Sequence, residues 1–213
     1  MATKKTTGTQ GKIEGKIEGK IEGKIEGKIA CLLATGFEDS EFDVPRQRLE
    51  QAGYRVEVIG AKAGEELKGY KGKVTTRVER AIDDVKPEDY EGLLIPGGHS
   101  PDTLRADERF VSFVRAFDQT KRPLAAVCHG PQLLITAGLV KGRTLTAWQT
   151  IQEDLRQIGA QVQDEQVVVD DNWITSRKPA DLEAFSDKLL EELHELEGRG
   201  LWPQTESRTQ MSV

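Results

Sequence analysis

Cys128, His129 and Gly130 follow one another directly after an apolar run at 123–127, and a short apolar helix ending at Gly138 is predicted to follow them. A cysteine between a strand and a helix matches a nucleophile elbow, a tight turn that lifts one side chain above a sheet edge. Cys128 is therefore a candidate nucleophile. The helix N-terminus and His129 should lower its pKa below the ~8.5 of a free thiol.

Cysteine also packs as a small hydrophobic side chain, and this is the alternative interpretation at both cysteine positions. Cys31 lies in the middle of a predicted strand, which favours a purely structural role. The context of Cys128, between a strand and a helix that begins with glycine, favours chemistry instead.

Two further groups of polar or flexible residues follow predicted strands. Gly97 and Gly98 end a buried run. One interpretation is that they only form a tight turn. The other is that they bring backbone amides close to a ligand and form an oxyanion hole together with the amide of His129. Glu38 lies in an acidic stretch in which one residue is expected to cap the next helix, and it is also a candidate for proton transfer. His99 is ambiguous, and His194 is expected to be solvated.

The spacing of the polar residues does not favour a metal or nucleotide cofactor. No Cys-x-x-Cys or His-x-x-x-His pair completes a zinc site around Cys128. The chain has no Gly-x-Gly-x-x-Gly after its first strand and no Walker loop. We therefore expect catalysis, if it occurs, to need no cofactor.

The elements that must position these residues alternate between strand and helix. Such alternation predicts an α/β fold with a doubly wound, mostly parallel sheet, whose ligand sites lie at the carboxyl ends of the strands. The predicted strands cover 28–34, 54–59, 74–78, 92–96, 123–128, 144–148, 167–169 and 173–175, and the predicted helices 44–52, 103–119, 130–138, 151–158 and 180–195.

The charge balance argues against nucleic acid and membrane as partners. The 213 residues include 30 Lys or Arg and 36 Asp or Glu, and the residues after Gly27 hold 24 and 32 of them, a net charge of −8. That surface would repel phosphate backbones and anionic lipids. The longest apolar run has six residues, against the ~20 of a membrane span. With two cysteines and no apolar segment of a secretory signal, we expect a cytoplasmic location.

The amino-terminal segment repeats Lys-Ile-Glu-Gly four times in register between positions 12 and 27. A glycine in each unit costs a helix ~1 kcal/mol relative to alanine. We therefore expect residues 1–27 to be a disordered tail, with a docked helix as the alternative. Residues 28–197 should form one domain and residues 198–213 a flexible tail.

The motifs together resemble the PfpI-type intracellular protease and protein deglycase family, within the class I glutamine amidotransferase-like superfamily. The resemblance covers roughly residues 28–195 and implies a flavodoxin-like sheet sandwiched by helices. The matching stretches are Gly36-Phe-Glu-Asp-Ser-Glu41, Leu94-Ile-Pro-Gly-Gly-His-Ser-Pro-Asp102, Ala126-Val-Cys-His-Gly-Pro-Gln-Leu-Leu134, Val167-Val-Val-Asp170 and Thr175-Ser-Arg177.

The resemblance assigns roles to individual residues. It implies Cys128 as nucleophile, Glu38 in contact with its sulfur and His129 as base. The resemblance also implies that Asp102 of a neighbouring subunit completes the triad, although the family usually has Glu there, a side chain longer by one methylene. The alternative is that Asp102 caps the helix expected over 103–119 of its own chain. Trp148 stands where some relatives place a histidine, so an indole should line the pocket.

The family's activities are peptide hydrolysis, glutathione-independent glyoxalase chemistry on methylglyoxal, and deglycation of proteins and nucleotides. We expect a deglycase or glyoxalase III-type hydrolase in a stress response, acting on a small dicarbonyl or on a glycated protein or peptide. The resemblance also implies a homo-oligomer, a dimer or a hexamer, with shared active sites. An intracellular cysteine peptidase, or a non-enzymatic redox sensor or chaperone that uses Cys128, are the alternatives.

Overall fold

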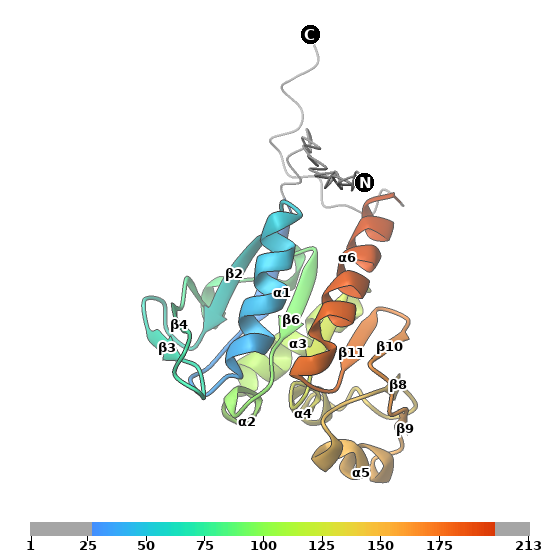
Figure 1. Ribbon diagram of the computed structural model, residues 1–213. Helices are drawn as coiled ribbons and strands as arrows, with labels where there is room; N and C mark the ends of the chain where they lie inside the picture. Colours follow the sequence, from blue (N-terminus) through green and yellow to red (C-terminus); the bar gives the residue numbers. More distant parts are fainter. Residues whose placement is uncertain (1–26, 199–213) are drawn as a thin grey trace, which may run out of the picture.

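Seven strands form one twisted sheet at the centre of the computed structural model, which describes residues 27–198 (Figure 1). All neighbouring strands run parallel except β10 and β11, which form an antiparallel pair at one edge. In sheet order the strands are β10 (Val167–Asp170), β11 (Trp173–Ser176), β7 (Leu124–Val127), β6 (Gly92–Ile95), β1 (Lys28–Leu32), β2 (Arg55–Gly60) and β5 (Arg80–Ala81).

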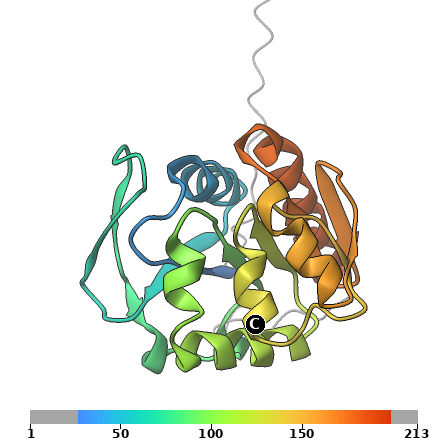
Figure 2. The same cartoon turned by 90° about the horizontal axis from the view of Figure 1, so that it is seen from below.

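Helices cover both faces of this sheet, as the view along the strands shows (Figure 2). Helices α1 and α6 lie on one face and α3 and α4 on the other. The helices are α1 (Asp39–Gln51), α2 (Ser100–Leu104), α3 (Glu108–Gln119), α4 (Pro131–Thr136), α5 (Gln149–Gln157) and α6 (Leu182–Gly198), with 3-10 turns at Ile82–Asp84, Pro87–Asp89 and Pro179–Asp181. The prediction of a doubly wound, mostly parallel, flavodoxin-like sheet is confirmed.

Alternation along β1 divides the core into two layers. Ile29 and Cys31 pack with the apolar residues of α1 and α6, whereas Ala30 and Leu32 pack with α3 and α4. Side chains of a strand point alternately to the two faces, so a central strand buried on both sides is apolar throughout. Cys31 is fully buried in the first layer, where burial raises the pKa of its thiol.

The structure departs from the predicted elements in several places, among them α1, which begins at Asp39 and not at residue 44, and the strands β5 and β9 (Gln161–Val162), which were not predicted. The helix expected over 103–119 is two helices, because Asp107 accepts a hydrogen bond from the Arg109 amide and so caps α3 at its own start. Between residues 59 and 74, where no element was predicted, the structure has β3 (Glu66–Lys68), which pairs with β4 (Thr75–Arg77) in a hairpin outside the main sheet. A further small sheet joins β8 (Thr144–Leu145) to β9.

The expected tails at 1–27 and 198–213 lie outside the described residues, apart from Gly27 and Gly198. The Gly27 carbonyl accepts a hydrogen bond from the Arg55 amide, so ordered pairing begins one residue before β1. Among the described residues, every helix is too short or too polar to cross a membrane.

Candidate active site

Cys128 occupies a strained turn between β7 and α4. Its φ is +60°, a left-handed conformation that residues other than glycine rarely adopt. The turn is held from both sides, because the Cys128 amide donates to the Ser176 carbonyl at 3.0 Å and the Cys128 carbonyl accepts from the Trp148 amide at 2.9 Å. A Cβ at Gly130 would lie 2.5 Å from the Ile95 carbonyl oxygen, so only glycine fits after His129. This is the predicted nucleophile elbow.

The Cys128 side chain faces a pocket of about 310 Å³ at the carboxyl ends of the central strands, and the residue is 7% exposed. The pocket brings together residues that are far apart in the sequence. Its lining is Glu38, Glu41, Tyr70, Lys71, Gly98, His99, Cys128, His129, Trp148 and Pro179. Five of these were predicted site residues: Glu38, Gly98, Cys128, His129 and Trp148.

The carboxyl group hydrogen-bonded to the sulfur belongs to Glu41, three residues after Glu38, for which this contact was predicted. Glu41 interacts with the Cys128 thiol and accepts a hydrogen bond at Oε2 from the Gly97 amide at 2.9 Å. Its Oε1 is buried without a well-aligned hydrogen bond to any described residue. Helix α1 begins at Asp39, so Glu41 lies in its first turn, and the residue is fully buried.

Glu38 lines the same pocket but is held by other partners. Its Oε1 accepts hydrogen bonds from Ser40 Oγ at 2.8 Å and from Lys71 Nζ at 2.9 Å. Glu38 stands at the N-cap position of α1, but its side chain makes no capping hydrogen bond. The neighbouring Asp39 instead accepts from the amides of Lys71, Lys73 and Val74, and thereby fixes the turn that carries Lys71 and Tyr70 to the pocket.

Burial and the neighbouring acid decide the protonation of this pair. Burial raises the pKa of Glu41 to about 7. Burial, and then the Glu41 carboxylate, raise the pKa of the Cys128 thiol, while the amides of His129 and Gly98 lower it. The pKa of Cys128 is therefore shifted in the direction opposite to the one expected from the helix N-terminus, first because the thiol is buried and second because the Glu41 carboxyl group stands beside it. A protonated Glu41 removes the repulsion, so the thiolate and the Glu41 proton are coupled.

The two glycines after β6 have different tasks. The Gly97 amide is occupied by Glu41, and a Cβ at Gly97 would lie 2.8 Å from the Cβ of Cys128. Gly98 has a φ of +75°, and its amide interacts with the sulfur. The amides of Gly98 and His129 therefore both point toward the sulfur, and Gly97 permits the close approach of its loop to Cys128.

His129 places its imidazole beside the sulfur. Its Nδ1 is 3.4 Å from the Cys128 Sγ, and its Nε2 is 3.5 Å from Thr150 Oγ1. Burial and the nearby His99 lower its pKa, which favours the neutral imidazole able to accept a proton. The indole of Trp148 lies beside it, with ring centroids 6.3 Å apart.

A family model described as "DJ-1/PfpI family" matches residues 27–192. The chain belongs to the DJ-1/PfpI family. It is 47% identical over 162 residues, 76% of this chain and 94% of the relative, to the Escherichia coli (strain K12) protein named "Protein/nucleic acid deglycase 2". Two Bacillus subtilis (strain 168) relatives are each 46% identical: "Putative cysteine protease YraA" over 76% of this chain and 95% of the relative, and "General stress protein 18" over 76% and 94%.

A solved structure confirms the DJ-1/PfpI fold. It is the two-domain protein with dj-1/thij/pfpi-like and ferritin-like domains from Anabaena variabilis, 38% identical with a TM-score of 0.77. The match covers 78% of this chain and 50% of that chain.

Asp102 lies apart from the pocket of this DJ-1/PfpI chain. It is exposed on the short helix α2, and it is not among the residues that line the pocket. The alternative expectation, a cap on the helix that follows, is wrong, because Asp107 caps α3. Among the described residues, no three His, Cys, Asp or Glu side chains are grouped to hold a metal ion.

Proposed function

We propose that the chain is a cysteine-dependent hydrolase of methylglyoxal-derived adducts on proteins, peptides or nucleotides, or of methylglyoxal itself in a glyoxalase III-type reaction. One observation carries the proposal. The Cys128 sulfur projects from a left-handed turn into a pocket where two backbone amides and one buried, protonatable carboxyl group surround it. The name of the Escherichia coli relative supports the substrate class.

In the proposed reaction the hydroxyl of a carbinolamine adduct loses its proton to His129 Nδ1 as the C–N bond breaks, and the imidazolium protonates the leaving amine, so that methylglyoxal is freed in the pocket. The Cys128 Sγ, its proton passed to His129, attacks the aldehyde carbon. A C–S bond forms and the carbonyl π electrons move to the oxygen, where the amides of Gly98 and His129 stabilise the negative charge until it is protonated.

The hemithioacetal on Cys128 then rearranges and is hydrolysed. Glu41 or His129 removes the hydrogen of the carbon bound to sulfur as a proton, and a proton is returned to the neighbouring ketone carbon, which converts the hemithioacetal into a 2-hydroxyacyl thioester with no change in atoms. Water attacks the thioester carbonyl, the C–S bond breaks, the sulfur takes back a proton and the 2-hydroxy acid leaves.

The dimensions of the pocket favour a small reacting group. A volume of about 310 Å³ lies at the lower end of ordinary ligand pockets. A three-carbon adduct fits beside Trp148 and His129, and the rest of a glycated protein stays outside. Cysteine peptidase activity is the second candidate, favoured by the name of the relative YraA.

The assembly and the cellular setting belong to the same proposal. We infer a dimer or hexamer in which Asp102 of one subunit approaches His129 of another, because Asp102 is exposed and has no contact with the pocket of its own chain. A cytoplasmic stress response is the proposed setting, supported by the name of the relative General stress protein 18.

A turnover assay with methylglyoxal and with methylglyoxal-modified peptide tests the function. Cys128→Ser should abolish turnover of both substrates, whereas Cys31→Ala, the matched control, should retain it because Cys31 is buried in the core. Cleavage of unmodified peptide without turnover of methylglyoxal would favour the peptidase. Absence of turnover together with stoichiometric, peroxide-dependent loss of the thiol would favour the redox sensor.

A further inference from the structure

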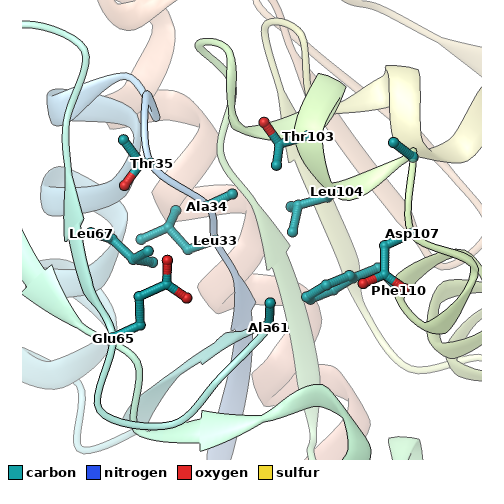
Figure 3. Close-up of a pocket in the computed structure, with 11 residues that line it drawn as sticks. Leu33, Ala34, Thr35, Ala61, Glu65, Leu67, Thr103, Leu104, Asp107 and Phe110 are labelled. Carbon is teal, nitrogen blue, oxygen red and sulfur yellow. The ribbon is translucent and has the colours of Figure 1, made fainter.

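A second and larger cavity, of about 460 Å³, lies beside the segment that follows β1 (Figure 3). Its floor and walls are mainly apolar. Leu33, Leu67, Leu104 and Phe110 line it, and each is at most 2% exposed. The volume lies within the range of small-molecule pockets, which are mostly apolar with a few polar groups that orient the ligand.

This cavity is separate from the pocket at Cys128, because the two share no lining residue. The segment that follows β1 and the helix α2 form adjoining walls, and the Ala34 amide donates to Ser100 Oγ at 2.9 Å between them. This bond ties the segment after β1 to the start of α2.

The charged groups that line the cavity are acidic, and the neutral polar ones are the hydroxyls of Thr35 and Thr103. Glu65 extends from the loop before β3, and Figure 3 shows its carboxylate directed into the cavity. Among the described residues, no hydrogen bond or ion pair to this carboxylate is found. Asp107, on the opposite wall, is neutralised by Arg109, which bonds both of its oxygens. One negative charge is therefore available above an apolar floor.

We propose that this cavity binds a small organic cation, an apolar body with a single ammonium or amidinium group that pairs with Glu65. The apolar floor favours a ligand with an apolar body, because binding removes apolar surface of both from water. The Glu65 carboxylate favours a positively charged ligand. An anion of the same shape would be repelled by Glu65, and a neutral molecule would leave this carboxylate without an ion-pair partner.

Three probes with one ring system test the proposal: naphthylmethylamine, naphthylmethanol and naphthoate. Binding to the full-length protein is followed by amide chemical shifts. The amine should bind most tightly and the carboxylate most weakly, with shift changes at Ala61, Leu67 and Thr103. Glu65→Gln should weaken the amine about two- to fivefold, as expected for a partly solvated ion pair, and leave the alcohol unchanged.

Two variants complete the test. Glu66→Gln is the matched control, because Glu66 pairs with Lys68 and does not line the cavity, and it should leave affinity for the amine unchanged. Ala61→Leu, at an exposed lining position, should weaken all three probes by filling the cavity. Equal affinity for amine and carboxylate, or shift changes centred on Trp148, would overturn the proposal. So would affinity that falls as protein concentration rises, which would assign the cavity to an interface between copies of the chain.

Discussion

Replacement of Glu41 by glutamine removes one titratable proton beside the Cys128 sulfur and keeps the size of the side chain. Burial raises the pKa of Glu41 to about 7 from an ordinary value of 4.5. The folded protein therefore holds this proton more tightly than the unfolded chain does. The resulting stabilisation is complete below about pH 4.5 and is lost as the pH rises through about 7.

The size of the effect follows from the two pKa values. A tenfold difference in proton affinity is worth about 1.4 kcal/mol, so values of 4.5 and about 7 correspond to about 3 kcal/mol of unfolding free energy. A glutamine at this position stays neutral at every pH, and its amide can still accept a hydrogen bond from Gly97 and donate one to the sulfur.

Urea unfolding near pH 4.5 and near pH 8 measures this difference. Wild type should lose about 3 kcal/mol more than Glu41→Gln between the two conditions. Glu38→Gln is the comparison variant and should keep most of the wild-type loss, because Glu38 is bonded to Lys71 and Ser40 and its charge is a lesser cause of the raised pKa of Glu41 than burial. The same loss in wild type and Glu41→Gln would refute the assignment of the buried proton to Glu41.

Three further predictions concern the backbone, the assembly and the amino-terminal segment. Gly98→Ala should abolish turnover and lower the unfolding free energy measured in urea by about 3 kcal/mol or more, because the new Cβ would lie 2.4 Å from the Gly36 carbonyl oxygen. Gly64 has a similar left-handed backbone but open space around it, so the control Gly64→Ala should lower the unfolding free energy by only about 1 kcal/mol. Mixing inactive Asp102→Ala and Cys128→Ser subunits under exchange conditions should restore some turnover, whereas full activity of Asp102→Ala alone would contradict a role in trans. Deletion of residues 1–26 should leave the melting temperature and turnover unchanged, and aggregation of the truncated protein would contradict this.

The sequence was sufficient to predict the sheet and the elbow because both depend on local patterns. Short apolar runs that alternate with amphipathic helices favour strands buried on two faces. A glycine directly after Cys128-His129 favours a tight turn between strand and helix, and the structure shows that a Cβ there would meet the Ile95 carbonyl. The helix expected over 103–119 was wrong because its hydrophobic spacing continues through the turn at 105–107, and only the Asp107 cap interrupts it.

The acid beside the sulfur could not be chosen from the sequence alone. Glu38 and Glu41 are three residues apart in one acidic stretch, and which of them turns inward depends on where α1 begins. The helix starts at Asp39, whose carboxylate is taken up by three amides of a distant hairpin turn. Lys71 and Tyr70 reach the pocket on that same turn. Nothing in the sequence around them indicates this contact, because it joins segments that are more than 30 residues apart.

The central claim, that Cys128 forms the covalent intermediate, is tested most directly by rapid-quench mass spectrometry during one turnover of a methylglyoxal-modified peptide. A substrate-derived adduct should appear on the peptide that contains Cys128, and it should form and decay at rates that account for turnover. The peptide that contains Cys31 should stay unmodified, because that thiol is fully buried. Turnover that proceeds without an adduct on Cys128, or at an undiminished rate in Cys128→Ser, would contradict the account.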